Sequence, residues 1–268
     1  MKETPCALTI AGTDPSGGAG IQADLKTFQE LKSYGMSVIT SVVAQNTTGV
    51  QDVFHLPLEM LKRQITSIIE DMPLHAMKTG MIANRDMMKV IAPVVQNKSV
   101  AYVMDPVMVA KSGDPLMEEA DRLFLRDELL PYADVVTPNL PEAEAWTGKQ
   151  IRDEKDMKEA AVQLVQQYGA GAALIKGGHL DGQAIDILYD GHHFRTFASE
   201  RINTKHTHGT GCTYSAAITA YLSQGYVLED AVEAAKQYVT SAIRHSFALG
   251  HGNGPTNHWA WREEVKSR

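Results

Sequence analysis

Cysteine, long apolar runs and an excess of positive charge are all lacking from this sequence. Its 268 residues include only two cysteines, Cys6 and Cys212, which lie far apart, so we expect free thiols in a reducing compartment and no disulfide. No apolar stretch approaches the roughly 20 residues that a membrane span needs, and the first residues contain no apolar signal core. These absences predict a cytoplasmic protein with no membrane segment.

The charge balance excludes another class of partner. The chain carries 25 Lys and Arg against 32 Asp and Glu, a net charge of −7 with His neutral, so nothing indicates a nucleic-acid surface. An acidic protein can still bind ATP, because local donors and Mg²⁺ dominate such a site. With 44% hydrophobic residues and no repeat or linker, the sequence predicts a single domain over residues 1–268.

Apolar runs of strand length alternate with segments of helical spacing along the chain. We expect strands at 7–11, 37–44, 75–81, 100–104, 134–137 and 172–175, and a hairpin over 184–189 and 193–197. Helices are expected at 21–34, 57–72, 85–96, 117–130, 156–168, 213–223 and 228–249, with Gly35 ending the first and 37–44 forming a central strand. This alternation predicts an α/β fold, a mostly parallel central sheet flanked by helices on both faces, with one ligand cleft along one sheet edge.

A loop at 203–212 leads into a run of small apolar residues. Gly209 and Gly211 allow positive φ and a close approach of the backbone to a ligand. The first NH groups of the helix that follows have no internal partners and lie at the positive end of its dipole, which suits an anion such as phosphate. A plain tight turn before a small-residue helix remains the alternative.

A second glycine loop, residues 12–20, follows the first strand. It resembles a P-loop only in outline, because Gly18 stands where that motif needs its Lys, and the dinucleotide fingerprint also fits poorly. Asp24, about one turn into the next helix, can reach back to the loop or can be a solvated helix acid. The ligand of this loop is left open by the residues alone.

Polar residues follow several of the predicted strands. Gln45 offers both a donor and an acceptor to a heterocycle, unless the amides near it only organise a turn. Asp105 ends a strand where open α/β sheets bind ligands. Asn139 and Glu142 suit Mg²⁺ through retained waters, or else they form a helix cap. Lys176, beside two glycines, is a phosphate contact or a surface residue before a turn.

Taken together, these segments resemble the kinases of the ribokinase superfamily. Within its vitamin-kinase branch they are most similar to the hydroxymethylpyrimidine/phosphomethylpyrimidine kinases of thiamine biosynthesis. The matching segments span nearly the whole chain in the family's order: residues 8–28, 43–47, 78–81, 105–108, 137–143, 175–179, 207–213 and 252–259. Singly they are weak signals, but jointly they are specific.

The resemblance implies a ribokinase-like fold, a homodimer, and two successive phosphorylations of hydroxymethylpyrimidine by ATP with Mg²⁺. It implies a pyrimidine pocket lined by Gly12, Ala19, Asp24, Val43, Gln45, Met81 and Val107. It implies ATP contacts at Asn139, Lys176, Thr207, Gly209, Thr210 and Gly211, and Mg²⁺ with its waters at Asp105, Asn139 and Glu142. Catalysis would involve Lys176, Gly209, Gly211 and Cys212.

Cys212 stands where the family's sugar kinases carry an Asp that acts as the base. A thiol at a helix N-terminus is expected to have a lowered pKa, so Cys212 as thiolate is a candidate base for the alcohol proton. Phosphoryl transfer depends mostly on positioning and electrostatics, so a strong base is not required. Three rival functions are pyridoxal/pyridoxine kinase, a nucleotide-binding regulator without turnover, and a nicotinamide-dependent oxidoreductase. Gln45 argues against the first, the intact site residues against the second, and the poor glycine fingerprint against the third.

Overall fold

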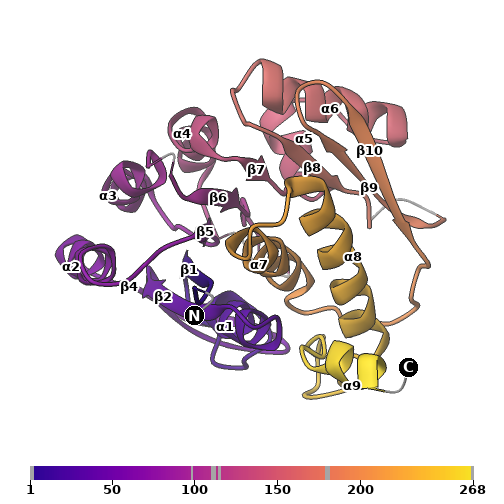
Figure 1. The fold of residues 1–268 in the computed structure, drawn as a ribbon, viewed down its shortest axis with the longest axis horizontal. Coiled ribbons are helices and arrows are strands. Elements are labelled where there is room, and N and C mark those ends of the chain that lie inside the picture. Colours follow the sequence, from indigo (N-terminus) through magenta and orange to yellow (C-terminus); the bar gives the residue numbers. More distant parts are fainter. Residues whose placement is uncertain (1–2, 98, 110–112, 114–115, 179–181, 267–268) are drawn as a thin grey trace.

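The chain folds around one mostly parallel sheet. The computed structural model describes residues 3–97, 99–109, 113, 116–178 and 182–266. The sheet has eight strands in the order β10-β9-β8-β7-β6-β5-β1-β2; neighbours from β2 to β8 run parallel, and β9 and β10 are antiparallel (Figure 1). The strands are β1 Cys6–Ala11, β2 Tyr34–Ile39, β5 Ala76–Thr79, β6 Ala101–Met104, β7 Val135–Val136, β8 Ala173–Lys176, β9 Ala184–Tyr189 and β10 Phe194–Ser199. The predicted architecture, including the hairpin, is confirmed.

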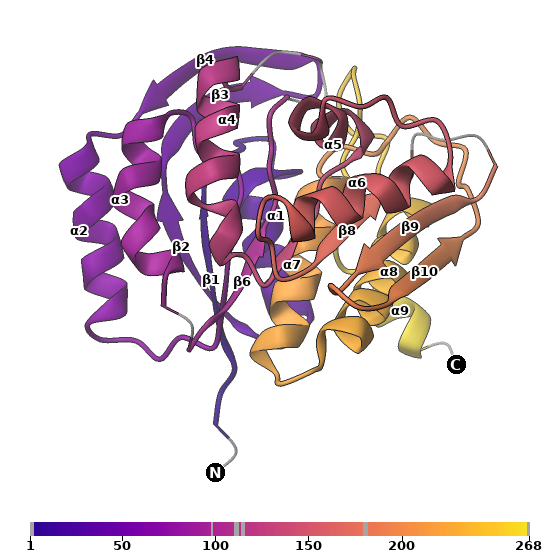
Figure 2. The ribbon, with the colours of Figure 1, turned by 90° about the horizontal axis from the view of Figure 1, so that it is seen from above.

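Helices cover both faces of this sheet (Figures 1 and 2). They are α1 Gly20–Glu30, α2 Leu58–Ile69, α3 Arg85–Val95, α4 Glu119–Glu128, α5 Leu140–Thr147, α6 Glu154–Gln166, α7 Thr210–Ser223, α8 Leu228–Arg244 and α9 Ala260–Lys266, with a 3₁₀ turn at Leu130–Tyr132. Strand β1 is buried along its whole length, with Leu8 and Ile10 in the core cluster under α2 and α3 and Ala7 in the cluster under α7 and α8. Burial on both faces explains why the parallel strands read as apolar runs.

Helix α7 lies against the centre of the sheet, where it contacts β1, β5 and β6. Ten of its fourteen residues are buried, and most of them are small, such as Ala216, Ala217 and Ala220. Small side chains let this helix pack close to the strands between α1 and α8. The beginning of α7 is thereby fixed beside the carboxyl ends of the central strands.

The expected strand at 37–44 is wrong. The chain bends at Thr40, and the run divides into β2, which is an edge strand, and β3 Ser41–Asn46, which leaves the main sheet. Strand β3 pairs with β4 Gly49–His55 in a separate antiparallel hairpin (Figure 2). Apolar β-branched residues flank the bend on both sides, and no Gly or Pro marks it, so the pattern hides the break.

Gly35 does not end the first helix either. Helix α1 ends at Glu30, and Lys32 adopts the left-handed conformation with a φ of 63°. Gly35 lies within β2, where an added Cβ would meet Leu25 at 3.0 Å and Phe28 at 3.1 Å. The glycine therefore permits close packing of α1 on the strand.

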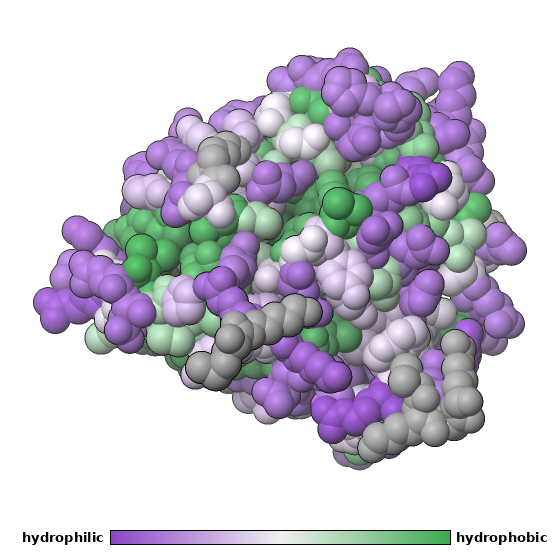
Figure 3. Space-filling view, in the orientation of Figure 1, coloured by the Kyte–Doolittle hydropathy of each residue, from purple (hydrophilic) through white to green (hydrophobic). Residues whose placement is uncertain are grey.

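Two predictions about the whole chain can also be compared with the structure. Cys6 and Cys212 are both free thiols, as expected. Within the described ranges, no helix is long and apolar enough to cross a membrane. Figure 3 shows hydrophilic residues around most of the rim of one face, with apolar residues gathered nearer its middle.

Candidate functional site

A cavity of about 780 Å³ lies at the carboxyl ends of the central strands. Its walls come from the ends of β1, β5, β6 and β8, from the β3–β4 hairpin and from the first turn of α7. It is bordered by every residue that the sequence suggested: Gly12, Ala19, Asp24, Val43, Gln45, Met81, Asp105, Val107, Asn139, Glu142, Lys176, Thr207, Gly209, Thr210, Gly211 and Cys212. The predicted cleft along one sheet edge is therefore present, whereas the roles of its residues remain predictions.

The start of α7 has the features of an anion site. Gly209 is its N-cap residue, with a φ of 78°, a conformation that glycine adopts at little cost, and no side chain caps the helix. Thr210 turns its hydroxyl away to the Thr207 carbonyl, at 2.8 Å. A Cβ on Gly211 would lie 3.5 Å from Lys176 Nζ, so the ammonium stands directly over the helix start. The uncapped amides and Lys176 together form a positively charged end of the cavity.

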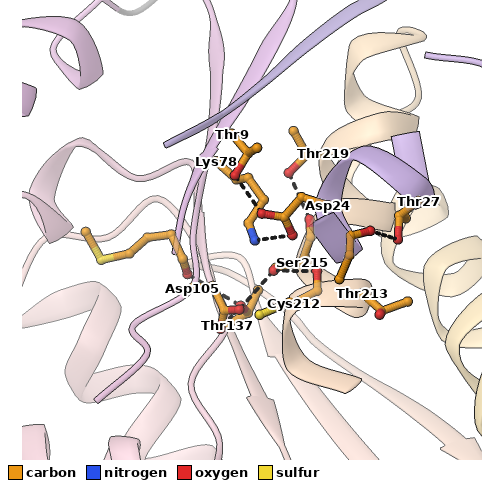
Figure 4. A network of polar contacts seen from close by, with 12 residues as sticks. Thr9, Asp24, Thr27, Lys78, Asp105, Thr137, Cys212, Thr213, Ser215 and Thr219 are labelled. Carbon is orange, nitrogen blue, oxygen red and sulfur yellow. Dashed lines mark hydrogen bonds and ion pairs between the residues drawn. The ribbon is translucent and has the colours of Figure 1, made fainter. Parts of the chain in front are cut away.

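Lys176 and Asp105 form an ion pair within this end of the cavity. Their Nζ and Oδ1 atoms are 3.3 Å apart, and the Lys176 side chain is only 14% exposed, so it is not the surface lysine of the alternative interpretation. Ser215 donates to the other Asp105 oxygen at 3.0 Å (Figure 4). Burial opposes ionisation of Asp105, but Lys176 and Lys78 hold the pKa of its carboxyl below the usual value.

Asn139 and Glu142 form the helix cap that the sequence offered as an alternative. Asn139 Oδ1 accepts from the Glu142 amide at 3.0 Å, and Glu142 Oε2 accepts from the Asn139 amide at 2.8 Å, a capping box at the start of α5. Burial raises the pKa of Glu142 to about 7, with Lys176 opposing the shift and Asp105 adding to it. The cap engages one oxygen of each side chain, and the role of both residues at a metal site stays a prediction.

The side chains around the cavity suit Mg²⁺ only if substrate phosphates and waters complete its coordination. Among the described residues, no three His, Cys, Asp or Glu side chains are grouped as a metal centre would require. Asp105 and Glu142 nevertheless border the same cavity, and Mg²⁺ in kinases is usually held by one or two carboxylates, substrate phosphates and waters. These two carboxylates satisfy that pattern.

A fully buried ion pair lies at the floor of the cavity. Lys78 Nζ is 2.8 Å from Asp24 Oδ1, Thr9 donates to Asp24 Oδ2 at 2.6 Å, and both charged side chains have no exposed area (Figure 4). Asp24 is therefore not a solvated helix acid. Sequence reasoning assigned no role to Lys78, although a lysine in the middle of a buried four-residue strand is a recognisable signal.

Cys212 does not have the lowered pKa that its helix position suggested. Burial raises the pKa of its thiol to about 12; Lys78 lowers it, while Asp24 and Asp105 raise it further. Desolvation and two nearby carboxylates thus outweigh the helix terminus and one ammonium. Cys212 is a neutral thiol near pH 7.

The opposite end of the cavity carries neutral and apolar groups. Val43 and Gln45 lie on β3 and border the cavity, as do Met81 and Gly12. Asn46 organises the hairpin turn by accepting from the Thr48 amide at 2.9 Å. The Gln45 carboxamide, by contrast, makes no hydrogen bond with any residue that the structure describes, so it is free for a ligand.

Comparison with known proteins relates this geometry to a family. The family described as "Phosphomethylpyrimidine kinase" matches residues 14–257. The chain belongs to this family. A hydroxymethylpyrimidine/phosphomethylpyrimidine kinase of Staphylococcus aureus is 49% identical over 97% of this chain and 96% of its own length.

Solved structures of pyridoxal kinases share the fold of this chain. The ADP complex of Bacillus subtilis pyridoxal kinase has a TM-score of 0.90 and 42% identity over 97% of this chain and 99% of that chain. Pyridoxal kinase of S. aureus in complex with AMP-PCP and pyridoxal has a TM-score of 0.89 and 37% identity over 97% and 95%. The ribokinase-like architecture is thereby established.

Proposed function

We propose that this chain uses ATP to phosphorylate 4-amino-5-hydroxymethyl-2-methylpyrimidine to its monophosphate and then to its diphosphate, as part of thiamine biosynthesis. One observation carries the proposal beyond family membership. A single cavity is bordered both by a positively charged, uncapped helix start and by the unbonded Gln45 carboxamide. A phosphate donor and a small neutral heterocycle with donor and acceptor edges match these two features.

The pyrimidine is assigned to the neutral end. Gln45 can exchange two hydrogen bonds with an aminopyrimidine edge, and Val43, Met81 and Val107 supply apolar contacts to the ring. Gly12 and Ala19 complete the wall. Asp24 also borders the cavity, but its two oxygens already accept from Thr9 and Lys78. Its contribution would be to neutralise the charge of Lys78.

The ATP phosphates are assigned to the helix start. The Gly211 and Cys212 amides and the Lys176 ammonium would stabilise negative charge on the transferring group. Asp105 and Glu142 would hold Mg²⁺ through its waters, because Asp105 already accepts from Ser215 and Lys176. When bound, Mg²⁺ supplies neutralisation of the phosphate oxygens during transfer.

Both phosphorylations would use the same arrangement. In the first, the alcohol oxygen attacks the γ-phosphorus as the bond from that phosphorus to ADP breaks. The alcohol proton passes late to an oxygen of the transferred phosphoryl group or to water, which a loose transition state permits without a strong base. In the second, the monophosphate oxygen is already charged and needs no deprotonation. Cys212, a neutral thiol, would position the acceptor in both steps.

Pyridoxal kinase activity is the second candidate, favoured by the 0.90 TM-score with a pyridoxal kinase. An ADP-release assay with Mg·ATP and three separate acceptors discriminates: hydroxymethylpyrimidine, its monophosphate and pyridoxal. We expect turnover on both pyrimidines, reduced in Gln45→Ala by about 10- to 100-fold in kcat/KM, the loss of one or two ligand hydrogen bonds. Gln51→Ala, an exposed amide on the same hairpin, serves as the matched control.

Turnover on pyridoxal alone would overturn the assignment of the pyrimidine.

We further propose that the chain acts as a cytoplasmic homodimer and as one kinase domain spanning residues 1–268, as the family resemblance implies. Light scattering coupled to size-exclusion chromatography measures the mass, and a monomer at assay concentrations would exclude the dimer.

A further inference from the structure

The two glycine loops of the cavity touch each other directly. A Cβ on Gly209 would overlap the Gly18 carbonyl oxygen, and a Cβ on Gly18 would overlap the Cδ2 ring carbon of His208. The loop at 12–20 borders the pyrimidine end, whereas the loop at 207–212 opens the anion site. Their contact therefore connects the proposed sites of the two substrates directly.

A side-chain hydrogen bond joins these loops, in addition to the one that the Gly20 amide makes with the Cys212 thiol. His208 Nε2 lies 2.7 Å from Asp14 Oδ2, joining side chains that are 194 positions apart in the sequence. Asp14 is fully buried, and its carboxylate also accepts from Ser16, from the Gly18 amide at 3.1 Å and from the Ala19 amide at 2.7 Å. Burial opposes ionisation of Asp14, but hydrogen bonds from His208 and Ser16 hold the pKa of its carboxyl well below the usual range. The carboxylate thus shapes the first loop and binds the second.

His208 is held equally firmly from the other side. Its amide donates to the Gly254 carbonyl at 3.1 Å, and its carbonyl accepts from the Thr256 amide at 3.3 Å, in a parallel bridge with the segment 254–256. Its side chain is only 12% exposed. Because both the backbone and the ring nitrogen of His208 are held, the residue fixes the position of one loop relative to the other.

We propose that His208 is a positioning residue that sets the distance between the pyrimidine loop and the phosphate loop. The proposal rests on the proposed function. His208 borders the cavity, but its Nε2 is already engaged by Asp14. Its role would be to hold Gly209 against Gly18, so that the acceptor oxygen and the γ-phosphate meet in line. Without His208, each loop would keep its own ligand contacts, but the two loops would lose their fixed placement relative to each other. Misplacement by about 1 Å can cost on the order of 100-fold in rate.

This mechanism predicts a specific kinetic pattern. In His208→Leu, kcat should fall by about 10- to 100-fold, while the KM values for ATP and for the pyrimidine should change by less than about threefold. His208→Gln places an NH group near the position of Nε2 and should restore kcat to within about threefold of wild type. His208→Asn, whose amide is too short to reach Asp14, is a second disrupting variant if the leucine variant does not fold.

His206→Leu is the matched control. His206 lies two residues away and accepts from the Gly254 amide at 3.0 Å, but it makes no contact with the first loop and does not border the cavity. Its kcat should remain within about threefold of wild type. All rates are referred to the folded fraction, measured from the stoichiometry of AMP-PCP binding.

Three results would overturn the proposal. An unchanged kcat per folded molecule in His208→Leu means that the hydrogen bond does not align the loops. A selective rise in one KM means that His208 contacts that substrate. A glutamine variant as slow as the leucine variant means that the bond to Asp14 is not responsible. A wild-type protein that phosphorylates neither pyrimidine rejects the proposed function instead, which keeps the two failures distinct.

Discussion

Replacement of Cys212 by serine tests whether a thiolate takes part in the reaction. The structure gives the thiol a pKa of about 12. At about pH 7.5, well below this value, almost all molecules would carry the neutral thiol. A preformed thiolate base is therefore a poor route, whereas a neutral thiol that contacts the acceptor can be replaced by a hydroxyl of similar geometry.

We expect Cys212→Ser to keep kcat within about tenfold of wild type, or about 1.4 kcal/mol of barrier, for both acceptors. The assay is single-turnover formation of monophosphate from the alcohol and of diphosphate from the monophosphate, each at saturating Mg·ATP. Iodoacetamide labelling followed by mass spectrometry gives an independent measurement, and Cys212 should react far more slowly at about pH 7.5 than a free thiol.

The opposite result has a clear signature. A loss above about 1,000-fold in the alcohol step, with the monophosphate step largely spared, would show that Cys212 removes the alcohol proton. Equal losses in both steps indicate damage to positioning alone. Rapid labelling at neutral pH would refute the raised pKa itself.

Two further predictions concern buried charge. Lys78→Met should lower the free energy of unfolding in urea by about 3–5 kcal/mol, because it leaves the Asp24 carboxylate buried without its partner. Adding Asp24→Asn should recover much of this loss. If the double variant recovers no stability, the two side chains are not a charged pair. Glu142 has a folded-state pKa of about 7 against an ordinary value of 4.5, so the native ligand-free protein binds more protons between these values and loses stability as pH rises through them. The change should be at most about 3 kcal/mol; Glu142→Gln, which preserves the capping box, should flatten it, and the same slope in both proteins would exclude Glu142 as its source.

Much of the fold follows from local patterns, and the exceptions have identifiable physical causes. Apolar runs predicted the central strands correctly because both faces of the sheet are covered by helices. The bend at Thr40 was hidden because β-branched residues dominate both the end of β2 and the start of β3. Gly35 was misassigned because a glycine after a helix usually ends it, whereas here close packing of Leu25 and Phe28 requires the missing side chain.

The candidate site divides in the same way. Glycine loops and polar strand ends identified Asp105, Lys176 and Gly209, because these signals depend on position next to a strand or helix. Lys78 and His208 act through partners far away in sequence, and no local pattern predicts such pairs. The pKa of Cys212 depends on burial, which becomes known only once α7 is placed against the sheet.

The segment that follows α8 gives the molecule an order of assembly. Besides holding His208, it fixes the hairpin tip, since the Gly252 amide donates to Thr47 Oγ1 at 3.1 Å and the Asn253 amide to the Thr47 carbonyl at 3.0 Å. All eight strands of the sheet are synthesised before these residues. On the ribosome, the strands of the sheet therefore emerge before the residues that complete the cavity wall at the hairpin tip and at His208.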